Sequence, residues 1–123
     1  MAEHNKLGIR GENIAAEYLL AESYTILEKN WRLGRLEIDI IASKGDRLVV
    51  VEVKTRTGVF VENLDEAVDR RKQELLVRAA NAYVAGTGLD ADVRFDIVTV
   101  IVGGTGKAAV NHIENAFYPQ LKK

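Results

Sequence analysis

The stretch VVVEVKTR, residues 49–56, begins as a buried β-strand and then places charged side chains where a buried strand would not. Three consecutive valines are typical of a strand that is covered on both faces. Because side chains alternate along a strand, Glu52, Lys54 and Arg56 share one face, and the opposite face carries Val49, Val51, Val53 and Thr55. This stretch therefore predicts a buried strand that runs into a charged patch.

A second strand with the same character precedes it. Residues 35–43, RLEIDIIAS, alternate in the same way, and the KGD sequence separates them from the strand that begins at Arg47. Gly45 suits the first central position of a two-residue type II′ turn, because that position requires a positive φ. Such a turn pairs Lys44 with Arg47 and predicts an antiparallel hairpin. A slip of one residue would turn one strand's charged set into the core, so it is disfavoured.

Two carboxylates face each other in this hairpin. Counting back from the turn places Asp39 across from Glu52, and a slip of two residues would pair Glu37 with Glu52 instead. Like charges directly opposite on a sheet are destabilising, so a compensating cation is expected. Two interpretations stay open. The face carries ion pairs with Lys54 and Arg56, or it holds a divalent cation, because oxygen ligands suit Mg²⁺ or Mn²⁺.

The rest of the chain supplies two helices and further strands. The second helix has Asn63 as a candidate N-cap and Gly86 as a candidate end. We expect one domain over 1–123, with a core at about 6–102 and a C-terminal extension at 103–123. The order α-β-β-β-α-β predicts an α/β fold, in which helices flank a mixed central sheet. The expected elements are a helix at 6–22, a strand at 24–32, the hairpin, a helix at 63–86, a strand at 92–102, a turn at 103–107, and a short strand with a frayed end at 108–123.

Composition narrows the class of protein. The chain has 123 residues, of which 47% are hydrophobic, so it can build a core without disulfides. It has no cysteine, which excludes thiolate zinc sites and fits a reducing compartment. No apolar signal segment or membrane span is visible, and we expect a cytoplasmic protein. The net charge of −1 gives no general attraction to nucleic acid, so such a role needs a local basic patch.

Several motifs together point to a known family. Asp39, twelve intervening residues, and Glu52-Val53-Lys54 after a run of valines resemble the core of the PD-(D/E)xK nucleases. Over residues 6–101, the chain also resembles the YraN-like family of bacterial proteins, which is similar in turn to archaeal Holliday junction resolvases. The motifs that carry this resemblance are GxxGE at 8–12, NWR at 30–32, EIDIIA at 37–42, VEVKTR at 51–56, Lys72-Gln73 and RFDIV at 94–98.

The resemblance implies a restriction-endonuclease-like fold and metal-dependent hydrolysis of branched or structured DNA. Asp39 and Glu52 match the metal ligands for Mg²⁺ or Mn²⁺, Lys54 matches the catalytic lysine, and Glu12 matches a glutamate that resolvase-like members carry on their first helix. DNA is the expected partner, and a homodimer is expected by analogy, because cutting two strands needs two sites. The alternative is a non-catalytic module that retains the fold and binds nucleic acid or a protein.

Two helical residues support this hypothesis from their positions alone. Glu12 falls in the small-residue stripe of the first helix, where an acid without a partner is costly. Its other interpretation is an acid at the edge of the stripe that pairs with Arg10 or reaches solvent. Lys72 lies in the apolar line of the second helix, either as a phosphate contact or as a lysine that snorkels to solvent.

The remaining polar residues divide into a basic rim and local structural groups. Runs of charge are typical of solvated faces, but beside a site that cuts phosphates they provide the contacts that backbone binding requires. Asp96 is predicted to pair locally with an arginine, and His4 and His112 are predicted to be structural or surface residues. The predicted nucleic-acid-binding residues are Arg32, Arg35, Arg56, Arg71 and Lys72.

Overall fold

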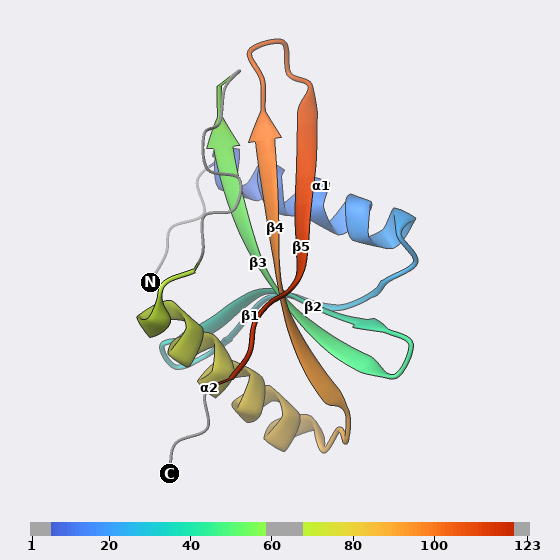
Figure 1. Cartoon of the computed structure of the whole chain (residues 1–123), viewed down its shortest axis with the longest axis vertical. Coiled ribbons are helices and arrows are strands. Elements are labelled where there is room, and N and C mark those ends of the chain that lie inside the picture. The colour runs from blue at the N-terminus through green and yellow to red at the C-terminus, as the bar shows by residue number, and fades with distance from the viewer. Residues whose placement is uncertain (1–5, 59–67, 120–123) are drawn as a thin grey trace.

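The chain forms one mixed sheet with a helix on each face (Figure 1). The computed structural model describes residues 6–58 and 68–119. The strands lie in the order β1-β2-β3-β4-β5, and only β3 and β4 are parallel. This architecture confirms the predicted restriction-endonuclease-like α/β class. The elements are α1 (Lys6–Ala21), β1 (Thr25–Leu33), β2 (Leu36–Lys44), β3 (Arg47–Thr57), α2 (Arg70–Thr87), β4 (Asp92–Val102) and β5 (Ala108–Phe117).

Alternation along β3 divides the core between the two helices. Val49 and Val51 pack in the cluster that contains the buried face of α1. Leu48 and Val50 pack in the cluster that contains the buried face of α2. A strand buried on both faces therefore reads as the unbroken apolar run seen in the sequence. None of the helices in the described part of the chain is long and apolar enough to cross a membrane.

The hairpin between β2 and β3 has the predicted register. Lys44 pairs with Arg47, and Gly45 has a φ of 62°, as the first central position of a type II′ turn requires. The ladder continues to the pair Ile40 and Val51 and ends there. Beyond that pair, β3 continues along β4 and β2 continues along β1, so the two strands diverge. We call this point the fork.

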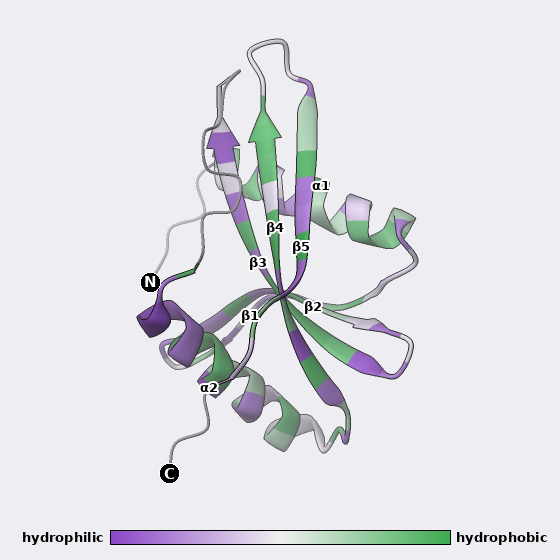
Figure 2. Ribbon diagram, viewed as in Figure 1, coloured by the Kyte–Doolittle hydropathy of each residue, from purple (hydrophilic) through white to green (hydrophobic). Residues whose placement is uncertain are grey.

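The end of β3 beyond the fork is polar. In Figure 2 its arrowhead is hydrophilic, whereas the arrowhead of the neighbouring β4 is hydrophobic. Glu52 and the residues that follow it in β3 are half-buried or exposed, whereas Leu48 to Val51 are buried. The charged patch predicted from the sequence therefore begins where β3 leaves β2.

The helix α2 differs from its prediction at both ends. It begins at Arg70 behind the N-cap Asp69, whose carboxylate accepts the Lys72 N–H at 2.8 Å. The predicted N-cap Asn63 lies outside the described residues. The helix continues past Gly86 to the C-cap Gly88, because Gly88 adopts the left-handed conformation with a φ of 73°.

The last strand is longer than predicted. Instead of a short strand, β5 spans ten residues and pairs antiparallel with β4. Its register shifts opposite the Phe95–Ile97 stretch of β4, and Asn115 there has a φ of 55°. This is a β-bulge, and it separates a regular first part of β5 from its end.

Candidate functional site

Asp39 lies at the fork, where its side chain accepts a backbone hydrogen bond from β3 in place of a carbonyl of β2. Its Oδ2 accepts the backbone N–H of Val53 at 2.8 Å, two residues beyond the last paired residue of β3. Continuing the register by one step would place Asp39 directly opposite Glu52. The carboxylate of Asp39 therefore satisfies a backbone donor that the divergence of the strands leaves without a carbonyl.

The carboxyl groups of Asp39 and Glu52 lie close enough that each shifts the pKa of the other. Burial raises the pKa of Glu52 to about 7, and the charge of Asp39 adds to this effect. Burial also raises the pKa of Asp39, although the Val53 N–H and Lys72 oppose this rise. The pair therefore holds a proton at a pH where exposed carboxyl groups have lost theirs.

Two lysines lie beside this pair. The Nζ of Lys72 is 3.6 Å from Oε2 of Glu52, with side-chain exposures of 37% and 16% respectively. Lys72 stands in the first turn of α2, where the helix dipole adds positive potential. Lys54 follows Glu52 on the same face of β3, and its charge also lowers the pKa of Glu52. The fork thus combines a half-buried acidic pair with adjacent cations.

Glu12 is buried, with 7% of its surface exposed, on the helix that covers the other face of β3. The helix α1 approaches β3 closely at the preceding residue, because a Cβ on Gly11 would lie 2.0 Å from Oγ1 of Thr55. Within residues 6–58 and 68–119, no group of three or more acidic, histidine or cysteine side chains is arranged to hold a metal ion. The structure therefore brings Asp39 and Glu52 together as a pair, and the role of Glu12 stays a prediction.

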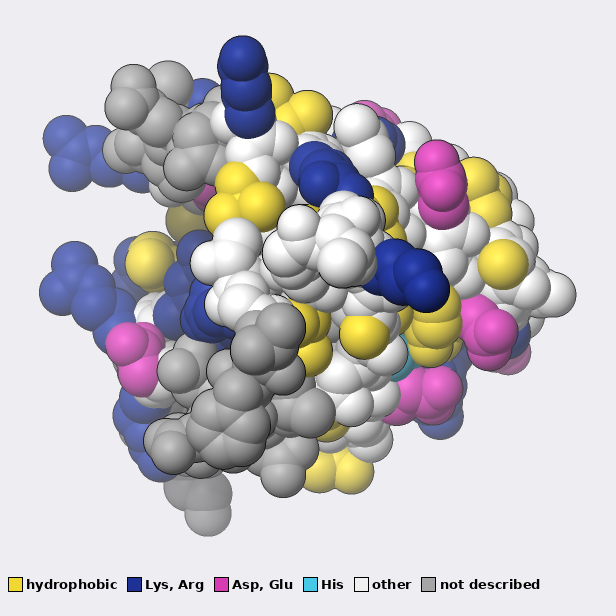
Figure 3. Space-filling view, turned by 90° about the horizontal axis from the view of Figure 1, so that it is seen from above, with side chains coloured by type: hydrophobic (Ala, Val, Ile, Leu, Met, Phe, Trp, Pro, Cys, Tyr) yellow, Lys and Arg dark blue, Asp and Glu magenta, His cyan; other side chains and the backbone are white. Residues whose placement is uncertain are grey.

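The predicted DNA-contacting residues come from β1, the β1–β2 turn, β3 and α2. Arg32, Arg35, Arg56 and Arg71 are exposed, and Lys72 is half-buried at Glu52. Arg32 lies 3.7 Å from the carboxylate of its cross-strand neighbour Glu37. In the view of Figure 3, lysine and arginine side chains gather mainly on the left, and acidic side chains mainly on the right. The net charge of −1 is therefore unevenly distributed over this face.

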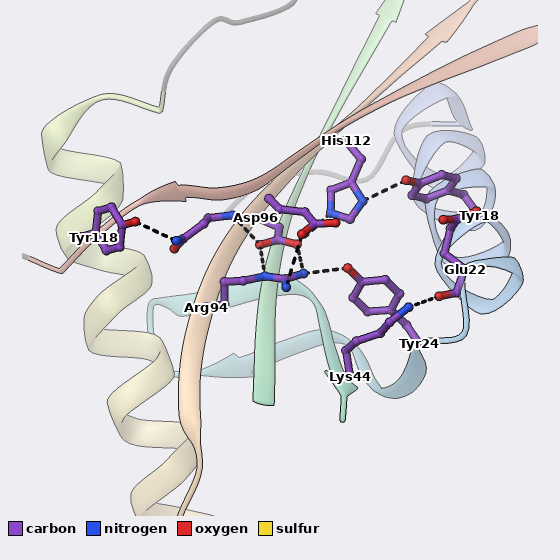
Figure 4. Close-up of polar contacts among 10 residues, drawn as sticks. Tyr18, Glu22, Tyr24, Lys44, Arg94, Asp96, His112 and Tyr118 are labelled. Atoms are coloured by element: carbon purple, nitrogen blue, oxygen red, sulfur yellow. Dashed lines mark hydrogen bonds and ion pairs between the residues drawn. The ribbon is translucent and has the colours of Figure 1, made fainter. Parts of the chain in front are cut away.

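A second polar cluster, centred on Asp96, lies between β4 and β5 (Figure 4). Asp96 is 1% exposed and accepts two hydrogen bonds from Arg94, at 2.9 and 2.8 Å. It also accepts the Asn115 N–H at 3.0 Å, at the bulge of β5. The predicted pairing of Asp96 with an arginine is found. The R-x-D spacing in RFDIV is the signal for it, because it puts both side chains on one face.

His112 and two tyrosines complete this cluster, and no local sequence pattern predicts the role of the tyrosines. The Nε2 of His112 lies 2.7 Å from Asp96, and its Nδ1 lies 2.9 Å from the hydroxyl of Tyr18. Arg94 also donates to the hydroxyl of Tyr24 at 2.6 Å.

These contacts fix the protonation states in the cluster. Burial opposes ionisation of Asp96, but hydrogen bonds from His112 and Arg94 lower its pKa below the ordinary value. An ionised Asp96 can only accept, so Nε2 of His112 carries a proton and donates it to Asp96, while Nδ1 shares a hydrogen bond with the hydroxyl of Tyr18. The cluster holds α1, β4 and β5 together, which agrees with the predicted structural role of His112.

Comparison with known proteins identifies the family. The model of "Uncharacterised protein family UPF0102" matches residues 11–100. A UPF0102 protein of Bacteroides thetaiotaomicron is 50% identical over 121 residues, which cover 98% of this chain and 99% of that protein. A UPF0102 protein of Porphyromonas gingivalis is 45% identical, with coverage of 100% and 92%. One from Christiangramia forsetii is 44% identical, with coverage of 96% and 98%. These matches confirm the resemblance to the YraN-like family.

Proposed function

This chain belongs to the uncharacterised protein family UPF0102, and we propose that it is a divalent-metal-dependent endonuclease that hydrolyses phosphodiester bonds in branched or structured DNA. The names of its relatives state no activity. The proposal therefore rests on the chemistry of the fork and on the PD-(D/E)xK spacing of Asp39, Glu52 and Lys54.

The observation that carries the proposal is the half-buried pair of Asp39 and Glu52, which the register of the hairpin sets opposite each other at the fork. Such a pair is stable only when a cation or a proton offsets its charge. Its donors are hard oxygens, which Mg²⁺ and Mn²⁺ prefer, so the residues present fit such an ion. Asp39 and Glu52 would hold it, with Glu12 as the third candidate ligand. A bound divalent cation supplies positive charge beside the phosphate and makes water a better nucleophile.

The cations of the chain supply the remaining functions. Lys54 lies beside Glu52 and is suited to orient the attacking water and to stabilise charge that develops on the phosphate. Lys72 now pairs with Glu52, and we expect it to turn to a phosphate oxygen when a divalent cation replaces the shared proton. Exposed arginines around the fork would hold the DNA backbone without reading its sequence.

A cleavage assay with a matched pair of lysine variants tests this function. We expect wild type to cut a four-way junction in Mg²⁺ or Mn²⁺, and to cut a linear duplex of the same sequence more slowly. Lys54→Ala should lose cleavage but keep Mn²⁺ binding in calorimetry, because carboxylates and not the amine hold the metal. Lys107→Ala, in the exposed β4–β5 turn, should cleave like wild type. Undiminished cleavage by Lys54→Ala would rule out its catalytic role.

One feature favours the alternative of a non-catalytic binding module. Lys72 already offsets part of the charge of Glu52, and the described residues hold no third acidic ligand grouped with the pair. Under this alternative, wild type binds the junction but leaves it intact in every divalent metal. The same assay therefore separates the two functions.

A further inference from the structure

The last strand of the sheet has one edge without a strand partner among the described residues. Gly103 donates its N–H to the carbonyl of Lys107 at 2.8 Å, which makes this a hydrogen-bonded pair at the start of the β4–β5 ladder. Such pairs alternate along an antiparallel ladder. The backbone groups of Ala109, Asn111 and Ile113 therefore point to β4. Those of Ala108, Val110 and His112 point to the open edge.

This edge lacks the features that protect most exposed edges. Proteins usually guard an edge strand with charged side chains, proline or a bulge. Residues 108–113 contain no Asp, Glu, Lys, Arg or proline, and the bulge begins only after Ile113. The ring of His112 is 7% exposed and is held by Asp96 and Tyr18, so it does not guard the edge.

The opposite edge of the sheet provides the contrast. The end strand β1 carries exposed Glu28, Lys29 and Arg32. It also has a register irregularity between Ile26 and Glu28, which bends an edge away from further pairing. Within the described residues, the edge at β1 is therefore guarded, whereas the edge at β5 is open.

We propose that β5 pairs antiparallel with β5 of a second copy of this chain, so that the two sheets become one. Pairing a strand with itself in the antiparallel direction is isologous, which matches the two-fold symmetry of most homodimers. The outward backbone groups fix the parity of the register. Of the registers with this parity, the one centred on the outward-facing residues 108, 110 and 112 places Val110 opposite Val110 of the second copy, and Ala108 opposite His112 of the second copy.

The back of the sheet offers further surface to the same contact. The helix α1 crosses behind the sheet, and its last turn reaches beyond β5 (Figure 1). That turn carries Leu20, which is 57% exposed. A second copy that joins at β5 would cover this leucine as well as the backbone edge, so the interface would include apolar burial.

The pairing has a consequence that rests on the proposed function. The two-fold axis between antiparallel strands is perpendicular to the sheet, so both copies turn the same face to the same side. Glu52 lies on the face of β3 that carries Leu48 and Val50, which is the face that α2 packs on. The carboxylate pairs of both copies would therefore face the same side of the dimer. Two sites on one side can act on the two strands of one DNA molecule.

Light scattering of the whole protein tests the pairing without metal or DNA. We expect wild type to have twice the chain mass of 13.6 kDa at micromolar concentration. Val110→Pro removes an outward N–H but no bond to β4, so it should give a folded monomer. Val110→Thr keeps the N–H and should remain a dimer. A monomeric wild type, or a folded Val110→Pro dimer, would overturn the proposal.

Cross-linking decides the matter if Val110→Pro does not fold. The proposed register puts Ala109 directly opposite Asn111 of the second copy, in a pair that is close enough for a disulfide. Because the chain has no cysteine, Ala109→Cys/Asn111→Cys should oxidise to a covalent dimer, whereas Lys29→Cys on β1 should not. Equal cross-linking of both variants would contradict the pairing. A failure of DNA cleavage would leave both measurements unchanged, so the two proposals fail separately.

Discussion

The proton held between Asp39 and Glu52 makes the stability of the metal-free protein depend on pH. Glu52 has a pKa of about 7 in the folded chain against 4.5 as its ordinary value. A raised pKa contributes stability that is complete below 4.5 and is lost as the pH rises through about 7. Wild type should therefore lose on the order of 3 kcal/mol of unfolding free energy across this window.

The measurement is urea unfolding in a chelator at several pH values, with Glu52→Gln for comparison. This variant cannot titrate at position 52, so its profile should be flatter than that of wild type. Parallel profiles for the two proteins would show that Glu52 does not hold the proton.

The variant Asp39→Asn distinguishes two roles for Asp39, namely a metal ligand and a partner in structural ion pairs. An asparagine at this position can still accept the Val53 N–H through its amide oxygen, and its NH₂ group can donate to Glu52. Asp39→Asn should therefore leave the metal-free protein as stable as wild type, or more stable by up to about 1 kcal/mol. The same change removes a ligand charge, so the thermal shift in Mn²⁺ should largely vanish.

Melting curves with and without Mn²⁺, at matched ionic strength, test this prediction. Asp46→Asn, in the exposed hairpin turn, serves as the control and should respond to Mn²⁺ like wild type. If wild type does not respond to Mn²⁺ and Asp39→Asn is destabilised, Asp39 is an ion-pair anchor and the metal site is wrong.

At the scale of elements, the close approach of α1 to β3 depends on the absence of a side chain at Gly11. An added Cβ would meet Oγ1, Cγ2 and Cβ of Thr55 at 2.0, 2.8 and 2.9 Å, so the helix would have to move. Gly11→Ala should cost about 1 to 3 kcal/mol of stability. Gly86→Ala is the matched control, because no atom lies within 4 Å of its Cβ, and alanine favours a helix.

Thermal unfolding of both variants checks this packing. Adding Thr55→Ala to Gly11→Ala removes two of the three contacting atoms and should restore part of the loss. Equal stability of the two glycine variants would mean that α1 does not rest on β3 at this point.

The elements also show which parts of the structure local sequence can predict. The hairpin and the meeting of Asp39 with Glu52 were predicted because turn chemistry and two-residue alternation are local. The length of β5 was not, because it depends on pairing with β4. The predicted start of α2 was too early, because the apolar periodicity of the sequence extends N-terminally past Asp69 into residues that precede the helix. The contacts of His112 with Tyr18 join residues 94 positions apart, which no local pattern shows.

At the scale of the whole molecule, DNA binding must come from a local patch, because the net charge is −1. If exposed arginines contact phosphates, the logarithm of the affinity should fall linearly with the logarithm of salt, by about 0.9 for each phosphate contacted. Arg35→Gln and Arg71→Gln should each reduce this slope by about 1, with little dependence on base sequence. Lys107→Gln is a distant exposed control.

The measurement is a salt titration of junction binding in Ca²⁺, an ion chosen to occupy oxygen ligands without supporting rapid cleavage. A chelator control should bind more weakly, because the pair of Asp39 and Glu52 then lacks the positive charge of the metal ion that attracts the DNA backbone. An affinity that does not change with salt concentration would show that the arginines do not contact phosphates. It would favour a protein partner. Equal binding with Ca²⁺ and with chelator would place the DNA away from the fork, even if the salt dependence is steep.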